Sequence, residues 1–228
     1  MDVIYIYTQY RLWQGAMKST PDRRTRKRLA TRQSISDAAT LLFFERGFDQ
    51  VTVDEIAEAA DVGRMTVFNH FPRKEDMFFD REQEIHDVAF EVVRTRGAGI
   101  SPIDALRLLA HHIVGEQHPF IPLFNGTGRF VETAMASEAL KARARQMRDD
   151  FIRALAVVLA EAVQRPADDP HAHLAAGMIA STWSVAFGEA QKVFDRVGDA
   201  GEAKRTFLAL IDRGCTGTVA ALAGTVYA

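Results

Sequence analysis

The chain has 228 residues, of which 47% are hydrophobic and 25% charged, and its formal net charge is -2. This length and composition are those of one or two globular domains, and they exclude a low-complexity or strongly charged disordered chain. No apolar run reaches the ~18 residues of a membrane span. We therefore expect no contact with a membrane. Cys215 is the only cysteine, so no internal disulfide is possible, which fits the reducing cytoplasm. We expect its thiol to be buried.

Residues 1–21 fit no helix, and the strand-like run Val3–Tyr7 has no evident partner. We expect this segment to be a disordered extension, or Met17 to be the true start of the protein. A first long helix should then cover residues 22–46, because five apolar residues recur at helical spacing. They are Ile35, Ala38, Ala39, Leu42 and Phe43. Gly47 can end this helix as a C′ glycine.

The segment Thr52–Asp76 predicts two short helices joined by a tight turn. Thr52 and Glu55 form a T-x-x-E capping box, so a helix should begin at Val53. The segment Asp61–Gly63 interrupts it, since Asp tolerates a left-handed backbone and Gly can cap the next helix. That second helix should span Arg64–His70, because Pro72 disfavours helix before it. This is the pattern of a helix-turn-helix unit, whose second helix lies in the DNA major groove.

The same stretch resembles the DNA-binding domain of the TetR (tetracycline-repressor-like) family of transcriptional regulators. The matching residues are Gly47, Phe48, Thr52, Ile56, Ala57, Ala59, Ala60, Val62, Thr66, Val67, Phe68, His70, Phe71, Lys74 and Glu75. Two residues depart from the family pattern. Asp61 stands where the family usually has Gly, and Gly63 stands where it often has Ser or Thr, so a side-chain contact to DNA is lost there.

Several residues of this stretch are candidates for DNA contact. Arg64 lies near the start of the second helix, where side chains reach base edges, and Arg is the commonest reader of guanine. Met65 can pack on a thymine methyl group, and Asn69 can contact the backbone or be solvated. The resemblance adds Thr52, Gly63, Thr66, Phe68, His70 and Lys74. Thr52 is also fully explained as a helix cap, and Phe68 as a partly buried core residue.

A basic run precedes this unit and consists of Arg23, Arg24, Arg26, Lys27, Arg28 and Arg32. Such a run is often only a solvated face, but before a helix-turn-helix it favours phosphate contacts, for which Arg26 and Lys27 are the candidates. In this setting residues 1–21 have a second interpretation, as an arm that docks on the body or enters a minor groove.

The remaining chain is predicted to be helical. One helix should run from Lys74 to about Arg96, and others should cover about 102–114, 129–136, 138–164, 171–197 and 202–222. In the resembled family the helix from Lys74 joins the DNA-binding head to a ligand-binding body. Between them, residues 115–128 combine Pro and Gly breakers with apolar side chains. An apolar loop must be buried or must line a cavity.

A cavity for a small hydrophobic ligand is therefore expected in the body, as the resemblance also implies. Its predicted lining is Leu109, His112, Phe120, Phe124, Arg129, Phe130, Met147, Phe151 and Trp183. Aromatic residues at helical spacing are more often plain core. A weak similarity to members that sense acyl-thioesters suggests that class as one candidate effector.

The last two helices are predicted to form a homodimer as a four-helix bundle. The stripe expected at the interface is Phe207, Leu210, Ile211, Gly214, Thr218 and Leu222, with Leu174, Met178, Ser181, Val185 and Gly188 on the preceding helix. A two-fold dimer would bind a near-palindromic, double-stranded operator.

The predicted fold is all-α, with an extension at 1–21, a helix-turn-helix head at 22–72 and a helical ligand-binding and dimerisation domain at 73–228. The function that the resemblance implies is a transcriptional repressor released from DNA by a small hydrophobic ligand. The alternative is a helical ligand-binding or scaffold protein that does not bind DNA. No catalytic or metal-binding motif is present, so we expect neither an enzyme nor a cofactor.

Overall fold

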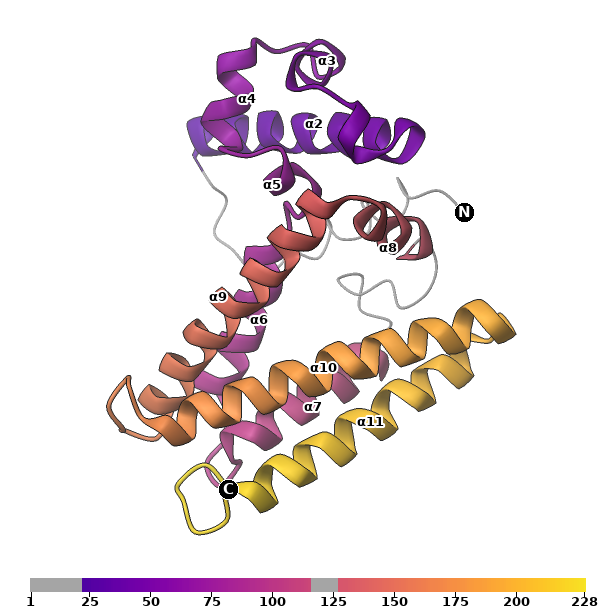
Figure 1. Cartoon of the computed structure of the whole chain (residues 1–228). Helices are drawn as coiled ribbons and strands as arrows, with labels where there is room; N and C mark the ends of the chain where they lie inside the picture. Colours follow the sequence, from indigo (N-terminus) through magenta and orange to yellow (C-terminus); the bar gives the residue numbers. More distant parts are fainter. Residues whose placement is uncertain (1–21, 116–126) are drawn as a thin grey trace. The chain divides into compact units, whose positions relative to one another are not determined.

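The computed structural model describes residues 22–115 and 127–228, and every regular element within those ranges is helical. The described residues form two compact units (Figure 1). The first unit holds residues 22–82 and 129–144, and the second holds residues 83–128 and 145–228 as far as they are described. The domain boundary expected after residue 72 stays a prediction. The first compact unit extends to residue 82 and also includes residues 129–144.

The first unit is built around α2 (Arg23–Arg46), followed by the 3-10 turn η1 (Phe48–Gln50) and the helices α3 (Val53–Ala59), α4 (Arg64–His70) and α5 (Glu75–Phe78). Most of α8 (Thr127–Ala136), from Arg129 onward, and the start of α9 (Glu138–Ala162) complete it. The large buried side chains of its core are Ile35, Phe43, Phe48, Ile56, Val67, Phe71, Met77, Phe78 and Leu140.

The local signals of the sequence hold in this unit. Both hydrogen bonds of the capping box between Thr52 and Glu55 are present at the start of α3. Asp61 has φ 52°, the left-handed backbone that an Asp tolerates, and Gly63 caps α4. Gly47 has φ 85° and ψ 146°, a conformation open to glycine alone, and it ends α2. The predicted bounds of α4 are confirmed.

The prediction of a single helix from Lys74 to Arg96 is wrong, because the structure has two helices there. The chain leaves the helix at Phe79 (φ −102°, ψ 35°) and resumes it as α6 (Glu82–Arg94). The break places two consecutive aromatic rings on one core: Phe78 stacks on Phe130 at 4.3 Å, and Phe79 packs edge-on to the same ring at 5.9 Å. Neighbours in a continuous helix would point about 100° apart, so the aromatic packing accounts for the interruption.

The second unit contains α6, α7 (Pro102–Gly115), the remainder of α9, α10 (Pro170–Val197) and α11 (Ala200–Ala221). Helices α10 and α11 lie side by side (Figure 1). They approach closely at Gly214, where an added Cβ would lie 2.2 Å from the Cγ2 atom of Thr182. The apolar stripe predicted on α7 is confirmed as buried: Ile103, Leu106, Leu109, Ala110 and Ile113.

The α11 stripe that was predicted to face a partner chain is instead core. Phe207, Ile211, Thr218 and Leu222 are each at most 1% exposed within this single chain. A stripe at helical spacing shows only that one face is buried, and here that face packs on the chain's own helices. Of the predicted interface, the α10 side chains Leu174 (47% exposed) and Val185 (56% exposed) do face solvent.

The last residues of the chain are fastened to the start of α10. The Tyr227 hydroxyl donates a hydrogen bond of 3.1 Å to Asp169, the residue that caps α10. The His171 N–H and the other bonds to that carboxylate hold the pKa of Asp169 down to about 2. Cys215 is buried as predicted, and burial raises the pKa of its thiol to about 11. Within the described ranges no helix is long and apolar enough to cross a membrane.

Candidate nucleic-acid interface

The face of α4 that turns away from the core carries most of the predicted DNA-contact residues. Val67 is fully buried and fixes the orientation of the helix. Because side chains follow a period of 3.6 residues, its neighbours point outward. Met65 is 70% exposed, Phe68 is 37% exposed, and Asn69 also faces solvent. An exposed Met and Phe beside polar side chains form a surface that can reach base edges and sugars.

Arg64, the first residue of α4, is held in a defined position. Its Nη1 atom donates to both carboxylate oxygens of Asp54, at 3.0 and 2.7 Å. Its Cζ atom lies 5.5 Å from the centroid of the Phe68 ring. Asp54 belongs to α3, so this ion pair joins the N-terminal turns of the two helices of the helix-turn-helix. No local pattern of residues predicted this pair.

Thr52 and Thr66 differ in how freely they could meet DNA. The Thr52 hydroxyl donates to Glu55 at 2.8 Å and accepts the Glu55 N–H, so the cap occupies it. These bonds lower the pKa of Glu55 to about 2. Thr66 is partly exposed next to Gly63, where an added Cβ would have the Thr66 Oγ1 at 3.9 Å as its nearest neighbour. The structure therefore has room for a Ser side chain at that position.

The C-terminal end of α4 is capped by an arginine of α2. Arg32 donates through Nη1 to the His70 carbonyl oxygen at 2.5 Å, and its guanidinium lies 3.9 Å from the Phe71 ring centroid. This contact fixes α4 on the long helix. Burial, followed by the charges of Arg32 and Arg28, lowers the pKa of the His70 imidazole.

Lys74 is turned into the first unit. Its ammonium donates to the carbonyl oxygens of Phe48 and Val51, both at 2.8 Å, and lies 4.1 Å from the Phe48 ring centroid. Burial lowers its pKa. Two of its three donors are thus used to close the η1 turn. Arg26 and Lys27, by contrast, project into solvent near the start of α2.

A later segment of the chain packs on the same unit, and nothing in the sequence pointed to it. The side chain of Leu140, at the start of α9, is fully buried in the core of the first unit. Arg129 donates to the Phe44 carbonyl oxygen at 2.6 Å, and Arg143 pairs with Asp76 at 3.0 Å. Residues 129–144 therefore belong structurally with α2 to α5.

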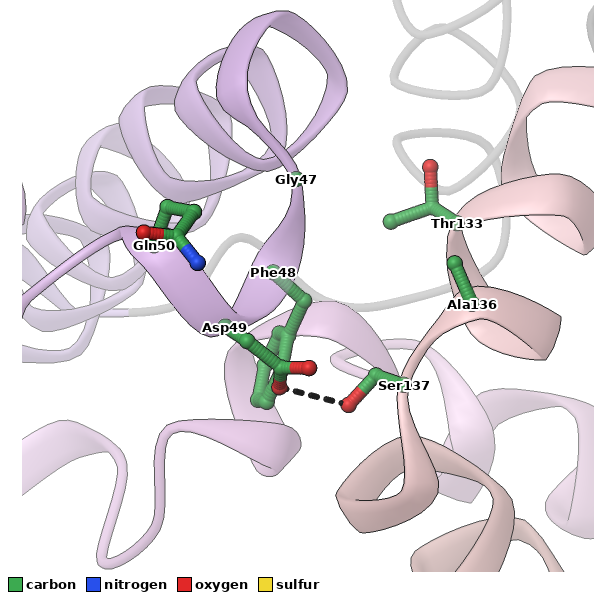
Figure 2. Close-up of a pocket in the computed structure, with 7 residues that line it drawn as sticks. All are labelled: Gly47, Phe48, Asp49, Gln50, Thr133, Ala136 and Ser137. Atoms are coloured by element: carbon green, nitrogen blue, oxygen red, sulfur yellow. Dashed lines mark hydrogen bonds between the residues drawn. The ribbon is translucent and has the colours of Figure 1, made fainter.

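A pocket of about 200 Å³ lies between this segment and the η1 turn. Figure 2 shows its lining from both sides: Gly47, Phe48, Asp49 and Gln50 face Thr133, Ala136 and Ser137. The Ser137 hydroxyl donates to Asp49 Oδ1 at 2.7 Å (Figure 2). The pocket marks where the start of α9 rests against the turn that leads into α3.

The residues predicted to line a ligand cavity are divided between the units. Arg129 and Phe130 lie in the first unit, and Phe120 and Phe124 fall outside the described residues. The others lie in the second unit: Leu109, His112, Met147, Phe151 and Trp183. Within it, Phe151 stacks on Phe90 at 5.8 Å, and the His86 ring lies tilted against Phe151 at 4.6 Å.

Trp183 is the most informative of these residues. Its ring packs edge-on to Phe207 at 5.7 Å. Its Nε1 atom is buried without a hydrogen-bond partner among the described residues. A buried N–H donor without a partner is costly, so this atom would gain from a ligand acceptor. Those same ranges bring together no group of three or more His, Cys, Asp or Glu side chains suited to a metal ion.

Known proteins resemble this chain both in the sequence of the helix-turn-helix and in the helical fold. Residues 35–80 match the family described as bacterial regulatory proteins, tetR family. The chain therefore resembles TetR-family regulators over its helix-turn-helix. It is 34% identical over 86 residues to the HTH-type transcriptional regulator TcmR of Streptomyces glaucescens, a stretch that covers 38% of this chain and 38% of TcmR. The chain thus aligns with less than half the length of that relative.

Two solved TetR-family structures share the fold over nearly their whole length. A putative regulator from Mesorhizobium loti has a TM-score of 0.53 at 18% identity, and the match covers 86% of this chain and 98% of that one. SmeT, the repressor of the Stenotrophomonas maltophilia multidrug efflux pump SmeDEF, has a TM-score of 0.52 at 22% identity, with 86% and 95% covered. The all-α fold with an N-terminal helix-turn-helix is thereby confirmed.

Proposed function

We propose that this protein is a DNA-binding transcriptional repressor. The observation that carries the proposal is the solvent-exposed face of α4, presented on a TetR-family helix-turn-helix. Arg64, Met65, Phe68 and Asn69 all face outward there, where a recognition helix meets base edges. The family match over residues 35–80 and the partial likeness to TcmR support the same function. Arg26 and Lys27 add an exposed positive end to α2, suited to phosphates.

The protein acts as a homodimer in this proposal, through the outer face of α10 and the flank of α11 beside it. Leu174, Ser181 and Val185 recur on one exposed side of α10, and Met178 is partly exposed between them. Exposed apolar side chains such as Leu174 and Val185, with the small Ser181 between them, favour association with a second copy. A two-fold dimer presents two recognition helices roughly 34–36 Å apart, which fits a near-palindromic operator.

A small hydrophobic ligand would release the repressor from DNA. The second unit supplies partly exposed apolar side chains at Phe151 and Trp183, and the unpaired indole N–H of Trp183 offers one donor. SmeT, which has the same fold, is known in a complex with triclosan, so the fold admits a small-molecule complex. An acyl-thioester remains one candidate class for the effector. The ligand must bind the DNA-incompetent state more tightly, since equal affinity for both states shifts nothing.

A selection from a randomised duplex library tests the proposed DNA binding, with the full-length protein as bait. The proposal expects a near-palindromic consensus. No enrichment would favour the alternative of a helical ligand-binding protein that does not bind DNA. For the ligand, a thermal-shift screen of hydrophobic metabolites and their coenzyme A esters should give hits that weaken binding to the selected DNA, typically by about 5–150-fold. Hits that leave DNA affinity unchanged would remove the switch.

A further inference from the structure

Asp54 and Arg64 form an ion pair on the surface proposed to meet DNA, and the pair does little for the fold. Their side chains are 63% and 59% exposed, and exposed pairs of this kind add little stability. An acidic side chain beside the first residue of a recognition helix would also repel phosphates. Its presence there calls for a reason other than stability.

The geometry leaves one edge of the guanidinium available. Only Nη1 of Arg64 is bonded to Asp54, with both carboxylate oxygens within 3.0 Å. Within residues 22–115 and 127–228, its Nε and Nη2 atoms make no hydrogen bond. These two atoms form the edge of an arginine that can donate two parallel hydrogen bonds. Guanine offers the matching pair of acceptors, O6 and N7, in the major groove.

Two neighbours restrict where this edge points. Asp54 lies in the first turn of α3, two residues after the capping-box residue Thr52. Phe68, one turn further along α4, lies 5.5 Å from the guanidinium carbon, within the range of a cation–π contact. An arginine held on two sides loses less conformational freedom when it binds a base, so its affinity for a correctly placed guanine rises.

We propose that Asp54 is a positioning and specificity-determining residue for Arg64. It orients the Nε–Nη2 edge toward a guanine and lowers affinity for every sequence that lacks one. At a matching site the oriented arginine offsets the repulsion between the Asp54 carboxylate and the DNA. At other sites the repulsion remains uncompensated, and specificity increases because wrong partners are penalised. The inference rests on the proposed DNA-binding function.

The test compares Asp54→Asn with the control Glu58→Gln, both made in the full-length protein. Glu58 is an exposed residue of the same helix, so both changes remove one negative charge and only one removes the contact with Arg64. The DNA probes are the selected wild-type consensus, its single-base variants and random-sequence duplex. The readout is the ratio of affinities within each variant, which cancels any difference in the folded fraction.

We expect both variants to bind random duplex more tightly than the wild type. Only Asp54→Asn should lower the ratio of consensus to random affinity, by about fivefold or more, with the loss confined to one base pair per half-site. In an Arg64→Ala background Asp54→Asn should leave the ratio unchanged, because the two residues act as one unit. Asp54→Glu, which keeps the charge, should retain part of the preference.

The possible failures are distinct. If Asp54→Asn and Glu58→Gln keep the full base preference while Arg64→Ala loses it, Arg64 reads the base unaided and the positioning role is overturned. If Arg64→Ala also keeps the preference, Arg64 is not the base reader, and the inference about Asp54 fails with it. If the wild-type protein selects no consensus at all, the proposed function itself fails.

Discussion

The Ser137 hydroxyl donates a hydrogen bond of 2.7 Å to Asp49 Oδ1, and so ties the start of α9 to the turn that precedes the helix-turn-helix. Ser137 is 2% exposed, and its Oγ also lies 3.4 Å from the Leu140 N–H in the first turn of α9. One side chain thus caps a helix and fastens it to the first unit. Because of this hydrogen bond, a movement of the start of α9 would also displace the η1 turn.

Ser137→Ala should lower the free energy of unfolding by about 1–2 kcal/mol, since it removes a helix cap and a partly buried hydrogen bond to a carboxylate. The measurement is urea unfolding, with Ser184→Ala, an exposed serine of α10, as the matched control. A double-mutant cycle with Asp49→Ala should give a coupling energy of at least about 0.5 kcal/mol. Additive effects of the two changes would show that the bond is not energetically coupled.

Leu140→Ala should cost about 2–5 kcal/mol, because Leu140 is fully buried in the core of the first unit and its truncation leaves a cavity. Leu41→Ala is the control: that leucine lies on α2 of the same unit but is 59% exposed, so the change should stay within about 0.5 kcal/mol. Chemical denaturation measures the free energy of unfolding of both variants, and the loss should be much larger for Leu140→Ala. Equal effects would mean that residues 129–144 do not pack on the first unit in solution.

Gly63→Ser should be neutral or stabilising by a few tenths of a kcal/mol, since a serine cap replaces a glycine cap of α4 and has room. Gly47→Ser should instead destabilise by about 1–3 kcal/mol, because a side chain is strained at φ 85° and ψ 146°. Thermal midpoints of the two variants test this contrast. A destabilised Gly63→Ser would show that the turn before α4 is tighter than the structure indicates.

Replacing both Arg26 and Lys27 by Ala should weaken binding to all DNA sequences alike. If each contacts one phosphate, the slope of log affinity against log salt should become shallower by about 1.8 in total. Fluorescence anisotropy at several salt concentrations gives the slope, and Arg145→Ala with Arg148→Ala, two exposed residues of α9, makes the same charge change elsewhere. An unchanged slope in the first variant would place both residues away from DNA.

The local structure of the helix-turn-helix could be predicted from sequence because its signals are short-range. The capping box at Thr52, the left-handed Asp61 and the bounds of α4 depend on neighbours a few residues away. The body was harder to predict. The stripe with Phe207 and Ile211 reports burial but does not distinguish a partner chain from the chain's own helices.

The site itself could be predicted in outline only. Residue types and spacing located Arg64 and the exposed face of α4. They could not locate the Asp54 carboxylate that holds Arg64 or the carbonyl oxygens that Lys74 binds, because those contacts join residues 10 to 26 positions apart. The docking of Leu140 and the break after Phe78 likewise depend on packing between distant segments.

Sequence-specific recognition through α4 is tested most directly by a competition experiment on the selected consensus DNA. Labelled consensus duplex is bound by wild-type protein or by Arg64→Ala, and is displaced with unlabelled consensus or random duplex. The wild type should prefer the consensus strongly, and Arg64→Ala should lose about 1–3 kcal/mol of that preference while its affinity for random duplex changes far less. A wild-type protein displaced equally well by both competitors would contradict sequence-specific recognition through α4.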